Sequence, residues 1–180
     1  MTADYKKIID LYYPADTPLR DIYLRHCRQV ADEALEIARR KHLPLDPLMI
    51  EGAAMTHDIG IFATDAPGIE CHGTEPYIAH GIIGAALLRK EGAPEEWARV
   101  AERHTGSGLT SAEIASQGLP LPVADYLPET LLERLICYAD KFYSKSGTMK
   151  RKDLQKVRAS MARFGEDSLR RFDALHSEFA

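Results

Sequence analysis

The sequence has few cysteines, and they form no disulfide or metal-binding pattern. Cys27, Cys71 and Cys137 are an odd number, lie far apart and include no Cys-X-X-Cys pair. The pattern therefore indicates neither a disulfide framework nor a thiolate zinc site. Cys27 and Cys137 fall on apolar helical stripes and are expected to be core residues. Free thiols of this kind are typical of a reducing compartment, so we expect a cytoplasmic protein.

Long apolar runs and an excess of positive charge are also absent. No apolar run approaches the roughly 20 residues that cross a bilayer, and the segment Met1–Lys7 lacks the apolar stretch of a signal peptide. The net charge is −4 with histidine neutral, whereas nucleic acids and acidic lipids usually need a basic face. We therefore expect no membrane partner and no nucleic-acid partner. A small anionic substrate stays open, because it needs only local positive charge.

The composition is that of one ordinary globular domain. The chain has 180 residues, of which 45% are hydrophobic and 28% charged, enough for one sizeable core. We find no internal repeat, low-complexity segment or linker. We therefore predict a single domain over 1–180, with a motif core at about 20–145 and C-terminal helices at about 150–178. The pattern does not distinguish a monomer from a homodimer.

Helical periodicity dominates, and no segment alternates convincingly as a strand. Glycines and prolines separate the periodic segments, with loops predicted at 63–74 and through much of 105–127. Thr110 and Glu113 predict a capping box at the start of a short helix. The sequence therefore predicts an all-α helical bundle. Its predicted helices cover 3–12, 20–42, 46–59, 76–91, 94–104, 110–116, 129–146 and, with a break near Gly165, about 150–178.

The strongest local signal is the sequence His57-Asp58-Ile59-Gly60 at the end of predicted helix 46–59. An adjacent His-Asp pair alone is weak, because chance and helix capping produce many such pairs. Here four further polar groups fall on apolar faces of other predicted helices. These are His26, beside Tyr23, Cys27 and Val30; His80, below Ile83 and Leu87; His104, after Trp97, Val100 and Ala101; and Asp140, among Leu135, Ile136 and Ala139.

Each interior histidine, taken alone, is more simply a core residue that is hydrogen-bonded to backbone. Asp140 fits that interpretation less well, because burying an unpaired carboxylate is costly. A shared metal centre satisfies all six groups together. Four imidazoles and two carboxylates suit two divalent ions, iron or manganese before magnesium, zinc, nickel or cobalt. Asp58 is the candidate bridge between two ions about 3.5–4 Å apart, which together hold a hydroxide and clamp a phosphoryl group.

The six candidates occur in a fixed order along the chain: His26, His57-Asp58, His80, His104 and Asp140. This order resembles the HD superfamily of metal-dependent phosphohydrolases, and residues 57–60 spell its HDIG variant. The resemblance covers about 20–145, and the two additional histidines are similar to its two-metal branch of small stand-alone proteins. It implies an HD-domain helical bundle. It also implies that His26, His57, Asp58 and Asp140 bind the first metal, and His80, His104 and the bridging Asp58 the second.

The resemblance implies hydrolysis of a phosphomonoester, phosphodiester or nucleotide-type substrate through a metal-activated hydroxide. Two alternatives stay open: an HD-type two-iron oxygenase, and a non-catalytic ligand-binding module that keeps the motif. The branch that cleaves cyclic di-GMP is disfavoured. It has a lysine where this chain has Ile61, and a Gly-Tyr-Pro segment that is missing after His104.

A phosphorylated substrate also needs positive charge beyond the metals. We predict Asp58 and Lys141 as catalytic residues, and Lys141, Arg25, Arg103 and Thr105 as substrate-binding residues, because each of these four adjoins a predicted ligand. Lys141 is favoured, since Ser144 and Lys145 lie one turn further along the same predicted helix. The loop 105–108 offers backbone N–H groups. Other residues have open roles: Tyr138 and Tyr143 either line the pocket or pack, and His72 either enters the site or is exposed.

Overall fold

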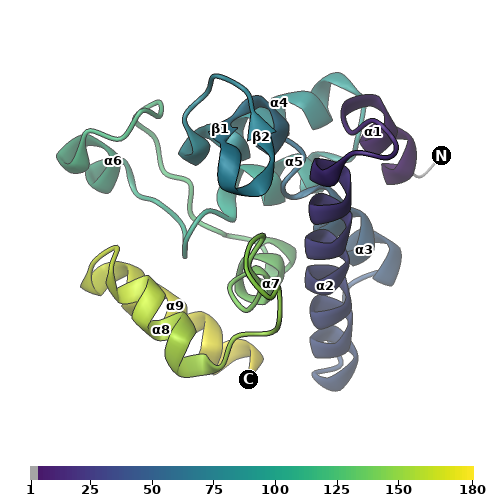
Figure 1. Cartoon of the computed structure of the whole chain (residues 1–180). Helices are drawn as coiled ribbons and strands as arrows, with labels where there is room; N and C mark the ends of the chain where they lie inside the picture. Colours follow the sequence, from purple (N-terminus) through teal and green to yellow (C-terminus); the bar gives the residue numbers. More distant parts are fainter. Residues whose placement is uncertain (1–3) are drawn as a thin grey trace.

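The computed structural model describes residues 4–180, and helices dominate it (Figure 1). The all-α prediction is thus confirmed. Within the described chain, the only sheet is an antiparallel pair of two-residue strands, β1 (Asp65–Ala66) and β2 (Cys71–His72). The α-helices are α1 (Tyr5–Tyr12), α2 (Pro18–Arg40), α3 (Pro47–Thr56), α4 (His80–Lys90), α5 (Glu95–Arg103), α6 (Ser111–Gln117), α7 (Leu131–Asp140), α8 (Leu154–Ala162) and α9 (Glu166–Phe179).

Most helices begin where the sequence offers a cap. The Thr17 side chain accepts a hydrogen bond from the Arg20 N–H at the start of α2, where Pro18 stands at the first position. The capping box of Thr110 and Glu113 at the start of α6 is confirmed. The first residue of predicted helix 3–12, and the N-terminal segment before it, lie outside the described residues.

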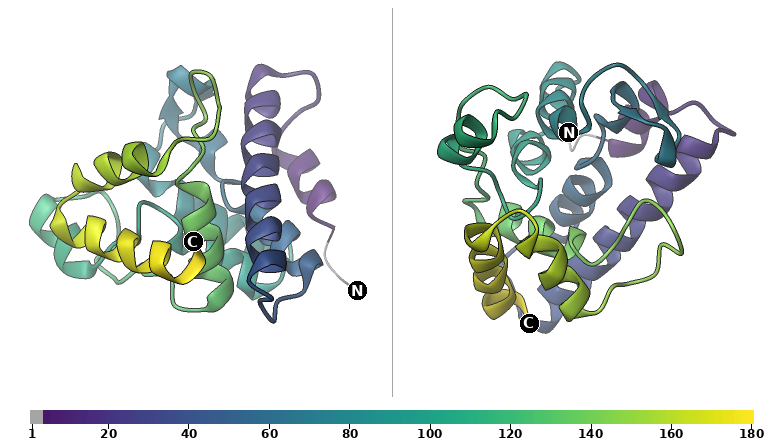
Figure 2. Two further views of the ribbon diagram at one scale, coloured as in Figure 1. Left: turned by 90° about the horizontal axis from the view of Figure 1, so that it is seen from below. Right: turned by 60° about the vertical axis from the view of Figure 1, so that its left-hand side comes forward.

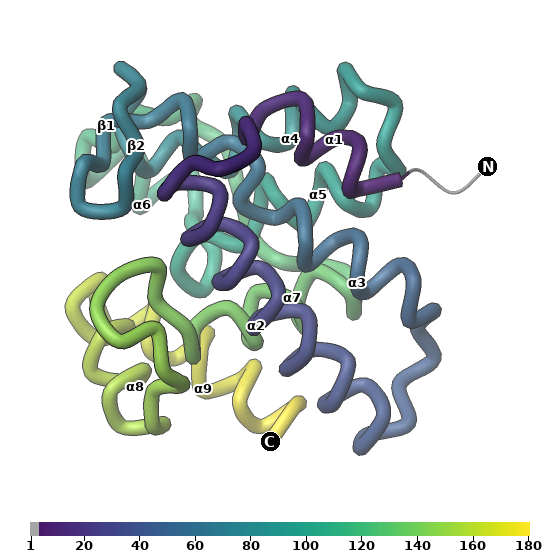
Figure 3. The backbone as a smooth tube through the Cα atoms, turned by 45° about the vertical axis from the view of Figure 1, so that its right-hand side comes forward, coloured from purple at the N-terminus to yellow at the C-terminus, as the bar shows by residue number. Residues whose placement is uncertain are grey.

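Several predicted boundaries are wrong, since α3 ends at Thr56 instead of residue 59 and α4 begins at His80 instead of residue 76. Predicted helix 129–146 ends at Asp140, because the chain then tightens into i→i+3 turns: the Phe142 N–H donates to the Ala139 carbonyl and the Tyr143 N–H to that of Asp140. The predicted loop 63–74 contains β1, β2 and a 3₁₀ turn over Pro67–Ile69. Figure 3 shows the irregular segment 141–153 that joins α7 to α8.

The long helix α2 packs against α3 and α7. Helix α5 contacts α3, α4 and α7, and the pair α8–α9 closes the other side of α7. α7 therefore lies between α2 and the C-terminal pair, as Figures 1 and 2 show. This central place carries the end of α7 to the same region as the ends of α3 and α5.

One cluster of buried side chains runs from Ile8 in α1 to Phe179 in α9. Two fully buried tyrosines in it hold the end of α3. The Tyr23 hydroxyl donates to the Met55 carbonyl at 2.6 Å, and the Tyr13 hydroxyl to the Ile59 carbonyl at 3.0 Å. Buried hydroxyls need such partners, so these bonds fix the backbone on both sides of His57.

The start of α4 lies against Gly60. A Cβ at residue 60 would lie 2.3 Å from the His80 carbonyl oxygen and 2.6 Å from the Gly84 nitrogen, so only glycine fits. Of the residues predicted on the interior face of this helix, His80 and Gly84 are buried, whereas Ile83 and Leu87 are only partly buried. Leu88, which was not predicted there, is buried as well.

Within residues 4–180, no helix is both long and apolar enough to cross a bilayer.

Candidate metal centre

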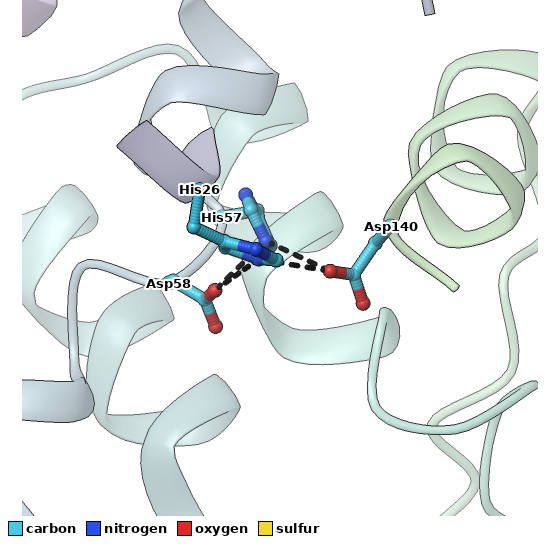
Figure 4. Close-up of side chains that lie close together, drawn as sticks. All are labelled: His26, His57, Asp58 and Asp140. Carbon is cyan, nitrogen blue, oxygen red and sulfur yellow. Dashed lines mark ion pairs between the residues drawn. The ribbon is translucent and has the colours of Figure 1, made fainter. Parts of the chain in front are cut away.

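Four side chains from three helices meet in a first group of potential ligands, His26, His57, Asp58 and Asp140 (Figure 4). The His26 Nε2 atom lies 3.1 Å from Asp58 Oδ2 and 3.0 Å from Asp140 Oδ1. The His57 Nε2 atom lies 2.9 Å from Asp58 Oδ2 and 3.5 Å from Asp140 Oδ1. We call these four residues the first cluster.

Asp58, His80 and His104 form a second cluster beside the first. The Nε2 atoms of His80 and His104 lie 3.4 and 3.3 Å from Asp58 Oδ1, and 3.0 Å from each other. The carboxylate of Asp58 therefore divides its oxygens: Oδ2 faces the first cluster and Oδ1 the second. This is the arrangement of a carboxylate that can bridge two cations.

Helix ends explain how three of these histidines are held. The last carbonyls of a helix have no partner within it, and a ring just beyond the helix can take one. His57 Nδ1 lies 2.6 Å from the Ala54 carbonyl at the end of α3, and His104 Nδ1 lies 2.8 Å from that of Ala101 at the end of α5. His80 Nδ1 contacts the Tyr77 carbonyl at 2.6 Å. Nδ1 donates in each contact, which leaves Nε2 free as a ligand when the ring is neutral.

The free atoms of the two clusters fit divalent cations. His26 Nε2, His57 Nε2 and Asp58 Oδ1 are buried and have no hydrogen-bond partner within residues 4–180. Buried polar atoms are normally paired, and imidazole nitrogens with carboxylate oxygens are a donor set for first-row transition metals. All six residues are buried, with Asp140 the most exposed at 8%. The donors present therefore suit a cation in each cluster.

Burial and neighbouring charges set the protonation of these groups. Burial and the adjacent His104 lower the pKa of His80 to about 3, and burial also lowers the pKa of His104. Both rings are therefore neutral at pH 7, as metal ligation requires. Burial alone would raise the pKa of Asp58, but the charges of His57 and Lys145 outweigh it and hold this pKa well below 3.8.

Two lysines reach the centre from the segment that follows α7. The Lys141 ammonium donates to Asp140 Oδ2 at 2.7 Å and to the His104 carbonyl at 2.9 Å. The Lys145 ammonium lies 2.7 Å from Asp58 Oδ2. Burial lowers the pKa of Lys145, but Asp58 more than reverses this and raises it well above 10.5, so Lys145 is a cation at neutral pH.

The centre opens into a cavity of about 590 Å³, a size typical of small-molecule sites. His80, His104 and Asp140 are among the residues that line it. Thr105 lines it as well, as do both lysines, Tyr143 and Ser144. A small molecule in the cavity therefore reaches both clusters.

The structure places other predicted contact residues away from this cavity. Arg25 is exposed and its guanidinium contacts the Thr148 carbonyl at 3.5 Å. Arg103 donates to the Leu127 carbonyl at 2.9 Å and lies 3.4 Å from Glu129. The His72 side chain is 68% exposed beside Glu70, and Tyr138 is buried.

Lys145 and Lys152 also line the cavity, and the sequence pattern assigned neither of them to the site. On the predicted helix, a residue five positions after Asp140 would point about 140° away from it. Only the early end of α7 turns Lys145 back toward Asp58. The one available signal was the spacing of lysines just after Asp140.

A model of the HD domain family matches residues 23–144. tRNA (cytidine(56)-2'-O)-methyltransferase of Picrophilus torridus is 35% identical over 134 residues, 74% of this chain and 35% of that protein. The protein of the same name from Thermoplasma volcanium is 30% identical over 174 residues, 96% of this chain and 46% of that protein. An uncharacterized protein of Methanocaldococcus jannaschii is 38% identical over 120 residues, 65% of this chain and 63% of that protein.

The chain thus spans less than two thirds of the length of each of these relatives. No solved structure matches it.

Proposed function

The chain belongs to the HD domain family, and on that premise we propose that it is a metal-dependent phosphohydrolase acting on a small phosphorylated substrate. The observation that carries the proposal is the division of the Asp58 carboxylate between two clusters. A single buried aspartate that serves two sets of imidazoles suits two cations held close together. Such pairs are used to clamp both oxygens of a phosphoryl displacement.

The residues of the site would have different roles in this reaction. His26, His57 and Asp140 would hold one divalent ion, His80 and His104 the other, and Asp58 both. Such ions lower the pKa of a bound water and stabilise charge on phosphoryl oxygens. The Lys145 ammonium, 2.7 Å from Asp58, offers a positive charge to the same oxygens. Lys141 holds Asp140 in place and lines the cavity.

Two relatives are named as tRNA methyltransferases, and this suggests a competing activity. The matched region is 35% and 46% of those proteins, so most of each lies outside the likeness. We do not extend methyl transfer to this chain, because its cavity gathers potential metal ligands and lysines, which serve phosphate chemistry. Transfer of labelled methyl groups from S-adenosylmethionine to tRNA by the purified chain would favour the competing activity.

The test is metal-dependent hydrolysis with a matched pair of variants. The protein supplied with iron or manganese should cleave p-nitrophenyl phosphate or bis(p-nitrophenyl) phosphate. Asp58→Asn should abolish this turnover and reduce bound metal. Asp65→Asn, an exposed aspartate outside both clusters, should change neither.

The alternatives have different outcomes. Substrate-dependent oxygen consumption without phosphate release would identify a two-iron oxygenase on the same ligands. A protein that binds ligands equally with and without metal, and turns over nothing, would be a binding module. Turnover that survives Asp58→Asn would overturn the proposal.

A further inference from the structure

Three lysines line the cavity, and one of them has no acidic partner. Lys141 pairs with Asp140, and Lys145 with Asp58. The third, Lys152, is partly buried, and no carboxylate within residues 4–180 lies within 4.0 Å of its ammonium. Burial lowers the pKa of Lys152, and Lys141 and Lys145 lower it further against the attraction of Asp140. Lys152 thus lines the cavity without a fixed counter-charge, and an anion bound there would pair with it.

An unpaired third cation favours a highly charged phosphate. A phosphomonoester carries about −1.5 to −2 charges at pH 7 and three terminal oxygens, whereas a diester carries only one charge. Lys152 offers a positive charge that can pair with the second negative charge of a monoester, which a diester lacks. The electrostatics of the cavity thus favour a monoester.

A smaller recess of about 180 Å³ adjoins the main cavity and shares Ile78, Thr105, Gly106 and Phe164 with it. Leu109 and Leu119 extend its apolar lining, and the exposed residue Gln117 also lines it. The Glu113 carboxylate in this recess is already bound by Arg171, at 2.8 Å, and by Thr110. The recess is therefore mainly apolar, with one free amide for a polar edge.

Two aromatic side chains stand exposed along this path. Phe164, common to the cavity and the recess, is 59% exposed, and Tyr77 in the cavity is 38% exposed. The Tyr77 ring lies 4.7 Å from the His80 ring, with the Lys145 ammonium 5.9 Å from its centre. Exposed aromatic rings that gather at one cavity indicate a ligand that covers them.

We propose, building on the phosphohydrolase proposal, that the substrate is a phosphomonoester with a flat, ring-containing body, of the size of a nucleoside monophosphate. Its phosphate lies between the metal clusters and Lys145 and Lys152, and its ring lies in the recess against Phe164 and Ile78. Together the two spaces fit one small molecule.

The test is equilibrium binding of three probes to the full chain by calorimetry, with and without manganese. Phenyl phosphate carries the charge and the ring, diphenyl phosphate lacks the second charge, and ethyl phosphate lacks the ring. We expect phenyl phosphate to bind about tenfold more tightly than either of the others, the size of one good charged or apolar contact.

Two pairs of variants assign these preferences to residues. Lys152→Gln should weaken phenyl phosphate about tenfold but leave diphenyl phosphate nearly unchanged. Lys150→Gln, an exposed lysine outside the cavity, should change neither.

Phe164→Ala should remove most of the preference for phenyl over ethyl phosphate. Val123→Ala, at an apolar residue that is 66% exposed but outside both spaces, should keep it.

The failures of the two proposals are distinguishable. Equal binding of phenyl and ethyl phosphate, or equal effects of Lys152→Gln and Lys150→Gln, would overturn the substrate class even if the protein hydrolyses bis(p-nitrophenyl) phosphate. The expected preferences in a protein that hydrolyses neither nitrophenyl ester would support the ligand class and sink the phosphohydrolase assignment.

Discussion

The two clusters and the rest of the cavity lining, which we call the cavity mouth, are built in different ways. Most of the ligands stand at helix ends: His57 and His104 cap α3 and α5, His80 begins α4, and Asp140 ends α7. Three of the rings are further held by backbone carbonyls three residues earlier. The mouth is formed largely by irregular chain around residues 105–106 and 141–153 and by the exposed ring of Phe164.

This difference indicates that the metal clusters need a rigid frame and that the substrate contacts do not. Metal coordination tolerates only small errors in ligand position, and helix ends anchored in the core hold positions closely. Substrates vary in shape, and loops carry the groups that contact them. Changes in the clusters should therefore act through bound metal, and changes at the mouth through substrate alone.

Metal removal should have the largest effect. Chelation should abolish hydrolysis and lower the melting temperature, because six buried polar groups lose their partner. With metal at 100 times its Kd, the lost stabilisation is about 2.7 kcal/mol, or roughly 5–10 °C for a chain of this size. Differential scanning calorimetry with metal analysis checks this, and Asp58→Asn should show almost no shift. Full activity in protein shown to be metal-free would contradict it.

Gly60→Ala should damage the second cluster without replacing any ligand. The added methyl would lie 2.3 Å from the His80 carbonyl, so α4 must move and carry His80 with it. We expect a loss of about 1–3 kcal/mol in unfolding free energy and a fall in bound metal toward one ion per chain. Urea unfolding and elemental analysis measure both. Gly68→Ala is the control, because its methyl would meet nothing within 4 Å; equal effects of the two changes would refute the argument.

Lys145→Met tests the link between the clusters and the mouth, because Lys145 belongs to the mouth segment but contacts Asp58. We expect kcat to fall about 10²-fold, as when a positioned charge is removed from a transition state, with the metal content unchanged. Lys150→Met should keep the activity. A loss of metal equal to that of Asp58→Asn would place Lys145 with the ligands instead.

Arg25→Ala and Arg103→Ala should have the smallest effects. Both side chains point to other partners, the Thr148 and Leu127 carbonyls, and neither lines the cavity. We expect KM and kcat to change less than about twofold, within the range of ordinary surface substitutions. A tenfold rise in KM for either variant would show that the mouth extends beyond the cavity described here.

The sequence was sufficient to predict the helical class and the grouping of the six polar residues. Periodicity placed His26 and Asp140 on buried faces, and the order of the histidines matched a known family. These residues could be identified because a polar group on an apolar helical face is an unusual and easily seen feature of a sequence.

The cavity mouth was harder to predict for a physical reason. The direction of Lys145 depends on where α7 ends, and helix ends are set by local turns that periodicity does not reveal. The position of α4 depends on the close approach of Gly60 to the His80 carbonyl and to Gly84, which is a tertiary contact. Arg25 and Arg103 illustrate the same limit, since neighbours of a ligand along the chain need not face it in space.

The placement of Asp140 also bears on the order of folding. Asp58, His80 and His104 come from a continuous stretch of chain that ends at α5, so their cluster needs only elements that are synthesised early. The other cluster joins His26 to Asp140 across most of the chain, and it is complete only when α7 packs against α2 and α5. Contacts between residues far apart in the sequence form more slowly than local ones, and chains emerge from the ribosome N-terminus first. We therefore expect the docking of α7 to be the step that completes the centre.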